Sequence, residues 1–335
     1  MEAPATPAEE APVFDHSPYA AGFLEQQSVR GYTLRSCIAS TDRTAVFKAD
    51  DQNLDRTVAV KVMRPWPGRE GVVEDFFSLA GSVARLRSPA ILRGLDAGRA
   101  DGSFFMAHEY VNGETLAGRL ARRQTGRFTE KESLKLAGLL AGLLRDLFEQ
   151  GHPHGNLTPA NVMLVDGGRG KLADIGFAWT LAWPDDASAF GTKPWYLPPE
   201  RIEGDLNVDI RGDLYSLGCI WHKALLGEDV FTGATPEEVL EKHRGERPAS
   251  PRDRDPRLSS TTEKLLLWLL EKDRDARPRT PRDFLRKLAL HPLLAEDAPV
   301  PERGGGEADA TDESAGGTNN GPNHEPMATD DNQEG

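Results

Sequence analysis

The chain has 335 residues, of which 38% are hydrophobic and 28% charged, and its formal net charge is -13. This length suits about two domains or one fold with two lobes, and the acidic balance argues against binding nucleic acid through overall charge. The most apolar run, Leu136–Leu144, is far shorter than the roughly 20 residues that cross a membrane. Only Cys37 and Cys219 occur, so we expect no disulfide framework or zinc site and a cytoplasmic location in a reducing compartment.

The negative charge is concentrated at the two ends. Residues 1–16 carry four acids and no Lys or Arg, and residues 296–335 carry eleven acids and one Arg, which leaves a net charge of only +1 for residues 17–295. Both ends lack a hydrophobic period, so we predict a disordered acidic, Pro-rich segment over 1–27 and a disordered acidic, Gly-rich tail over 294–335. The beginning has no apolar core preceded by basic residues, so we expect no signal peptide.

Between the ends, strand signals come first. Val58, Val60 and Val62 alternate with Ala59 and Lys61, which predicts a half-buried strand over 57–62. A partner strand is expected over 44–49, across a polar turn at 50–55. Apolar residues at helical spacing predict a helix over 72–86, and residues 104–111 are typical of another short buried strand.

After Gly113 the sequence becomes rich in helix signals. Thr129, Thr235, Ser260 and Thr280 are each followed three residues later by Glu or Asp, the pattern of a capping box at a helix N-terminus. A strand-rich part followed by a larger helical part indicates an α+β fold with two lobes.

Six segments, in this order and at this spacing, resemble a bacterial-type Ser/Thr protein kinase. They are Val58–Lys61, Gly151–Asn161, Lys171–Gly176, Leu197–Glu200, Asp209–Gly218 and Asp275–Pro278. The resemblance implies a bilobal protein-kinase-like domain over 28–293. Its small β-rich N-lobe would cover about 28–112 and its larger helical C-lobe about 113–293, with nucleotide bound between them.

Several residues match the family's nucleotide site. The resemblance implies that Lys61 holds nucleotide phosphates and that Asn161 and Asp174 coordinate Mg²⁺. It further places Val46, Ala59 and Met163 around the adenine, with the hinge residues Glu109 and Val111 beside it. ATP with Mg²⁺ is therefore the expected cofactor.

Other positions depart from the family's pattern. Asn156 stands where the family has its catalytic Asp, and an amide has no basic oxygen to take the proton of a substrate hydroxyl. Thr158 replaces the loop's Lys, and Gly155 replaces its Arg. Leu79 stands where a Glu would hold Lys61, and Glu74 could substitute only if the helix were displaced. The three glycine positions of the phosphate loop hold Ala39, Thr41 and Thr44.

The remaining matches are architectural. The resemblance implies an ion pair between Glu200 and Arg277 and an anchoring role for Asp213 beneath the catalytic loop. Ile175 replaces the usual Phe and is expected to pack as an apolar residue. His108, beside the hinge, is interpreted as a half-buried histidine rather than a catalytic one. The segment around Thr192 is one residue longer than the common pattern.

We therefore predict a pseudokinase that serves as an ATP-binding scaffold or allosteric regulator in signalling, with a protein partner or client kinase. Two alternatives stay open. One is a weakly active kinase that transfers the ATP γ-phosphate to protein hydroxyls. The other is an interaction module that binds no nucleotide.

Overall fold

The structure of this chain is a computed structural model. The residues it describes are 28–40, 44–63, 81, 83–100, 103–123, 126–176, 194–205 and 209–295. Leu79, Glu74, Thr41, Thr192, residues 1–27 and residues 296–335 lie outside the described residues, as does most of the helix predicted over 72–86. The first two residues of the tail predicted over 294–335, Leu294 and Ala295, belong to a short helix instead.

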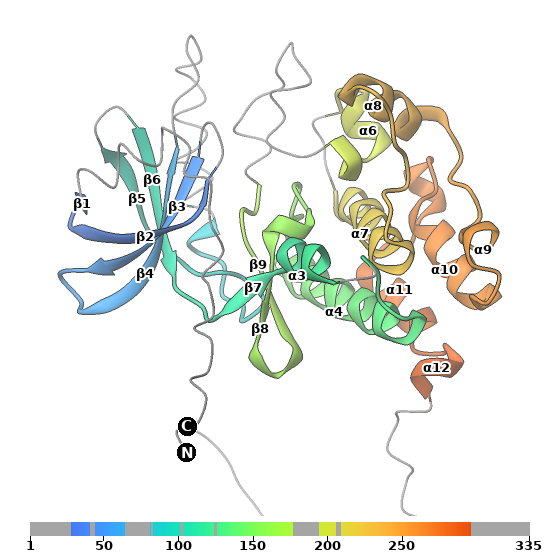
Figure 1. Ribbon diagram of the computed structural model, residues 1–335, viewed down its shortest axis with the longest axis horizontal. Coiled ribbons are helices and arrows are strands. Elements are labelled where there is room, and N and C mark those ends of the chain that lie inside the picture. Colours follow the sequence, from blue (N-terminus) through green and yellow to red (C-terminus); the bar gives the residue numbers. More distant parts are fainter. Residues whose placement is uncertain are drawn as a thin grey trace, which may run out of the picture. The chain divides into compact units, whose positions relative to one another are not determined.

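The first part of the chain forms a six-stranded sheet with the strand order β1-β2-β3-β4-β6-β5 (Figure 1). All neighbouring strands are antiparallel. The strands are β1 (Ser28–Val29), β2 (Tyr32–Ser40), β3 (Thr44–Asp51), β4 (Arg56–Met63), β5 (Gly94–Ala100) and β6 (Ser103–Glu109).

The alternation seen in the sequence sorts the two faces of this sheet. Val58, Val60 and Val62 are fully buried and join the N-lobe core with Phe47 and Phe105. The residues between them on β3 and β4 are only partly buried, because successive side chains of a strand point to opposite faces. The predicted strands and their burial pattern are confirmed.

A second, three-stranded antiparallel sheet follows the hinge. It consists of β7 (Gly113–Thr115), β8 (Val162–Val165) and β9 (Arg169–Leu172) in that order. This sheet packs against helix α4 (Glu130–Phe148) through β9. A Cβ on Gly170 would lie 2.9 Å from Leu143 Cδ1, so a larger residue there would require the Leu143 side chain to shift.

The other regular elements among the described residues are helices and short 3₁₀ turns. The α-helices are α3 (Leu116–Arg122), α4, α6 (Pro199–Ile202), α7 (Ile210–Leu226), α8 (Pro236–Gly245), α9 (Pro251–Arg254), α10 (Ser260–Leu269), α11 (Pro281–Leu288) and α12 (Pro292–Ala295). Short 3₁₀ turns are η1 (Pro159–Asn161), η2 (Asp166–Gly168), η4 (Pro194–Tyr196) and η5 (Arg274–Ala276).

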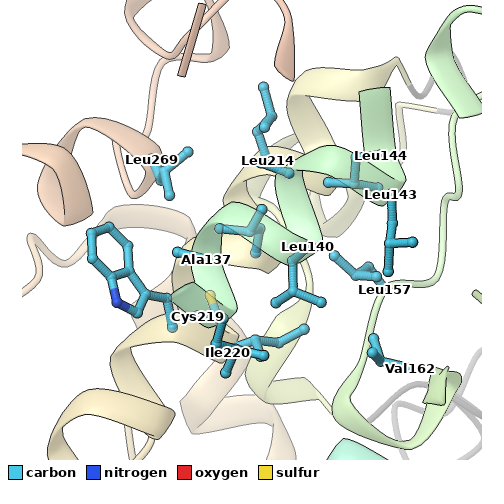
Figure 2. Packing of buried hydrophobic residues seen from close by; sticks show 14 of the residues in the cluster. Ala137, Leu140, Leu143, Leu144, Leu157, Val162, Leu214, Cys219, Ile220 and Leu269 are labelled. Atoms are coloured by element: carbon cyan, nitrogen blue, oxygen red, sulfur yellow. The ribbon is translucent and has the colours of Figure 1, made fainter. Parts of the chain in front are cut away.

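The C-lobe core lies where α4 meets α7. Leu140 and Leu144 of α4 face Leu214 and Ile220 of α7, with Leu157 from the loop that follows α4 beside them (Figure 2). All five side chains are buried. Because apolar burial contributes about 25 cal/mol per Å², this core supplies much of the lobe's stability and holds the loop in place.

The predicted helix starts are mostly correct. Thr129 and Thr280 form complete capping boxes with Glu132 and Asp283, and the Thr235 side chain accepts a hydrogen bond from the Glu238 amide. The prediction for Ser260 is wrong by one residue.

At that helix the cap is Ser259, not Ser260. The Ser259 hydroxyl accepts a hydrogen bond from the Thr262 amide, and the Glu263 carboxylate accepts one from the Ser250 hydroxyl instead of reaching back. Ser259 Oγ also lies 3.0 Å from Nε2 of the buried His291, a contact that selects it over its neighbour.

The architecture is thus an α+β fold with a β-rich N-lobe and a helical C-lobe, as predicted. Of the helices that the structure describes, none has the length and apolar character needed to span a bilayer.

Candidate functional site

Two charged residues from different lobes meet at the centre of the predicted site. Lys61 lies on β4 and Asp174 follows β9, and Lys61 Nζ is 2.6 Å from Asp174 Oδ2. Asp174 has a φ of +57°, a left-handed conformation that Asp tolerates better than most residues. This backbone turn aims the carboxylate at the lysine.

The Asp174 carboxylate is ionised. Burial raises its pKa, but the positive charge and hydrogen bond of Lys61 outweigh that effect, and the pKa is lowered overall. Two nearby histidines are uncharged, because burial lowers the pKa of His108 and of His154 to about 4. Lys61 is therefore the dominant positive charge acting on Asp174.

The loop from His154 to Asn161 is held from below by helix α7. The backbone amides of His154 and Gly155 donate hydrogen bonds of 2.6 and 2.8 Å to the two oxygens of the Asp213 carboxylate. Burial raises the Asp213 pKa to about 7, and the two amide hydrogen bonds oppose that rise. The predicted anchoring of the loop by Asp213 is confirmed.

Asn156 sits within this anchored loop. Its amide N–H donates to His154 Nδ1 at 3.2 Å, and its carbonyl oxygen accepts from Asn161 Nδ2 at 2.8 Å. Its side-chain oxygen, Oδ1, is buried and accepts no hydrogen bond from any described residue. Thr158 is buried at the start of η1, where its side chain makes no capping hydrogen bond.

Asn161, at the end of η1, and Asp174, which follows β9, lie in segments that a backbone hydrogen bond joins. The Ala173 amide donates to the Asn161 carbonyl at 2.8 Å, which ties the residue before Asp174 to Asn161. Because Asn161 Nδ2 points at Asn156, its Oδ1 points away as an acceptor. One amide oxygen and one carboxylate are hard oxygen ligands that fit Mg²⁺ bound with phosphates. Within the described ranges, no group of three His, Cys, Asp or Glu side chains forms a closed metal site.

The apolar candidates flank these charges. Val46 is the cross-strand neighbour of Lys61, and Ala59 is that of His108, so all four belong to adjoining strands of one sheet. Val46, Ala59 and Lys61 alternate with the buried core positions and therefore share the opposite face. Met163 lies on β8, half-buried, at a position that alternates with core residues.

The hinge contains a tether that the sequence did not reveal. Lys171 Nζ on β9 is 2.8 Å from Glu109 Oε1 at the end of β6 and also donates to the Ile91 carbonyl at 3.2 Å. Burial raises the pKa of Glu109, but Lys171 and the Arg93 amide outweigh burial and lower it overall. Glu109 thus links the two lobes through its side chain. Val111, two residues on, is half-buried.

The predicted pair of Glu200 and Arg277 is confirmed. The Arg277 guanidinium binds both Glu200 oxygens at 2.8 Å and donates to the carbonyls of Arg211, Glu271 and Lys272. Its side chain is fully buried. Because a buried charge that loses its partner is costly, each residue of this pair depends on the other.

Comparison with known proteins gives a consistent result. The family model described as "Protein kinase domain" matches residues 33–292. The serine/threonine-protein kinase PknB of Mycobacterium tuberculosis is 32% identical over 246 residues, which cover 70% of this chain and 39% of that protein. The DNA damage-responsive serine/threonine-protein kinase RqkA of Deinococcus radiodurans is 30% identical over 245 residues, covering 71% and 36%. The chain thus spans less than two fifths of the length of these relatives.

Among solved structures, the PknI kinase domain of Mycobacterium tuberculosis has a TM-score of 0.63 at 24% identity. The match covers 78% of this chain and 96% of that domain. At this identity the likeness concerns the fold, and it includes both lobes.

Proposed function

The chain belongs to the protein kinase family, and from that premise we propose that it is a pseudokinase. In this proposal it binds ATP with Mg²⁺, has lost most phosphoryl transfer, and regulates a protein partner such as a client kinase. The observation that carries the proposal is Asn156, an amide at the position of the catalytic base in a loop that is otherwise anchored as the family requires.

Nucleotide binding is supported by the charged groups that remain. The Lys61 ammonium and the Asp174 carboxylate are 2.6 Å apart, which places the group expected to hold phosphates beside the group expected to hold a cation. The Asn161 side chain is fixed by its hydrogen bond to Asn156, which orients its oxygen in advance. When bound, Mg²⁺ would neutralise phosphate charge.

Loss of transfer is supported by the chemistry of Asn156. A general base contributes about 10²–10⁴-fold to such reactions, and an amide oxygen does not take a proton at neutral pH. The buried Asn156 Oδ1 has no described donor beside it.

Regulation of a partner would follow if nucleotide binds one conformation of the domain more tightly than another. If nucleotide favours one arrangement of the lobes, its occupancy shifts the population of that arrangement and so the surface offered to a partner. The Glu109–Lys171 tether joins the end of β6 to β9, where such a change would be transmitted.

Thermal unfolding of the purified chain tests the binding half of the proposal. Saturating ATP with Mg²⁺ should raise the midpoint by about 5 to 10 °C, from about 2.7 kcal/mol of binding stabilisation at 100 times the Kd. Asp174→Ala should abolish the shift. The control is Lys264→Met, which changes an exposed lysine of α10 and should retain the shift. No shift at millimolar ATP would favour an interaction module without nucleotide.

A weakly active kinase is the second candidate, favoured by the intact Lys61–Asp174 pair. Labelled ATP with Mg²⁺ or Mn²⁺ and a generic protein substrate decides between the two. Transfer that disappears in Lys61→Met but persists in Lys264→Met would replace the pseudokinase proposal with this one.

A further inference from the structure

A surface hollow of about 490 Å³ lies in the C-lobe between the end of α10, the turn η5 and helix α11. We call it the α10–α11 hollow. None of its lining residues belongs to the candidate nucleotide site. Those that matter for its chemistry are Trp268, Arg279, Lys287 and Leu290.

The hollow has a fixed apolar part. The half-buried Trp268 indole is held in place because its Nε1–H donates to the Ala276 carbonyl at 3.0 Å. Leu290, two residues after the end of α11, is 80% exposed. An aromatic ring beside an exposed leucine offers a surface that gains free energy when an apolar side chain covers it.

The hollow also carries positive charge that its own acids do not neutralise. Asp275 is paired with Arg211, and Asp283 caps α11 through Thr280 and pairs with Arg286. Within the described part of the chain, Arg279 and Lys287 pair with no carboxylate. Lys287 Nζ instead lies 4.0 Å from the centre of the Trp268 ring, which keeps it over the apolar part.

We propose that the α10–α11 hollow binds an acidic peptide segment of a partner protein. An apolar side chain of that segment would cover Trp268 and Leu290, while its carboxylates would bind Arg279 and Lys287. A nucleic acid fits less well, because residues 17–295 have a net charge of only +1 and so offer no extended basic face.

Fluorescence anisotropy with the full chain tests this. The probe is a short fluorescein-labelled peptide of alternating Glu, Asp and Leu. The control peptide has the same sequence with Gln and Asn in place of the acidic residues. We expect saturable binding of the acidic peptide only, weakened by added salt. Arg279→Glu should weaken it about tenfold or more.

The controls are matched. Arg279 is exposed and has no described partner, so Arg279→Glu should unfold at the temperature of the parent chain. Arg247→Glu makes the same charge change on an exposed arginine of another surface segment and should bind like the parent. Leu290→Asp should also weaken binding. Equal affinity of the parent and Arg279→Glu would overturn the proposal.

Two further outcomes are decisive. If a DNA duplex binds as tightly as the peptide and loses affinity in Arg279→Glu, the hollow is a nucleic-acid site instead. The ATP-induced thermal shift should be the same in Arg279→Glu and the parent. The anisotropy assay therefore tests peptide binding at the hollow, while the thermal shift tests nucleotide binding separately.

Discussion

Acidification should destabilise this domain through its buried histidines. His108, His154 and His243 are all buried, and burial lowers the pKa of the first two from 6.5 to about 4 and of His243 to about 3. Their contacts agree with a neutral ring, since His154 Nδ1 accepts from the Asn156 amide and His243 Nδ1 lies 2.9 Å from the Tyr215 hydroxyl.

The size of the effect follows from proton linkage. Below pH 6.5 the unfolded chain protonates these histidines and the folded chain does not, so stability that is present above pH 6.5 is lost as the pH falls toward 4. Between pH 8 and pH 5 each histidine removes about 2 kcal/mol, or about 6 kcal/mol for the three.

Asp213 acts in the opposite direction. Because burial raises its pKa to about 7, the folded state binds this proton first, and stability rises by about 2.5 kcal/mol over the same interval. From these four groups the net loss at pH 5 is therefore about 3 to 4 kcal/mol, a large share of the roughly 5–15 kcal/mol that stabilises a typical domain. Burial also lowers the pKa of His222 and His291, which act in the same direction as the other histidines and add to the loss.

Urea unfolding followed by tryptophan fluorescence at pH 8 and pH 5, at constant ionic strength, measures this loss. Stability that is flat or higher at pH 5 would refute the reasoning. The difference in the free energy of unfolding between pH 8 and pH 5 should be about 2 kcal/mol smaller in His243→Gln than in the parent, whatever the effect of the substitution on stability at pH 8.

Three other predictions concern single side chains. Asn156→Asp should raise transfer from labelled ATP to a protein substrate by about 10²-fold, the low end for a general base, because Thr158 is unchanged; an unaltered rate would contradict the role assigned to Asn156. Arg277→Met should lower the free energy of unfolding by about 3–5 kcal/mol in urea titrations, because it leaves Glu200 unpaired. A loss below 1 kcal/mol would show that the pair is dispensable, and Arg286→Met, which is 77% exposed, should cost less than about 0.5 kcal/mol. Thr280→Ala should cost about 1 kcal/mol by the same measurement, since it removes the α11 capping box, and no change would mean that another group caps the helix.

Local structure was predictable from the sequence where a short residue pattern is compatible with only one backbone arrangement. The alternation of Val58, Val60 and Val62 predicted a half-buried strand, because only one register puts all three into the core. Thr129 and Thr280 predicted helix starts, because a hydroxyl followed by an acid at the third position satisfies two backbone amides at once. The order of the kinase-like segments then predicted both lobes and the Asp213 and Glu200–Arg277 contacts.

Choices between equivalent residues were not predictable. Ser259 and Ser260 are chemically identical, and the contacts of Ser259 with His291 and Glu130, from elsewhere in the chain, decide which of them caps α10. The Glu109–Lys171 tether escaped notice for the same reason, because many surface Glu and Lys residues could pair and no local pattern selects these two.

The sequence by itself determined the kinase-like order of elements, the amide of Asn156 at the position of the family's catalytic Asp, and the near-neutral charge of residues 17–295 between acidic ends. Only the tertiary structure decided that Lys61 meets Asp174, that Asn156 Oδ1 is left without a described donor, and that Arg279 and Trp268 share one hollow. The physical reason is the sequence separation of the residues that interact. Strand alternation and helix caps depend on neighbours within a few residues, whereas ion pairs and hollows depend on which distant segments packing brings together.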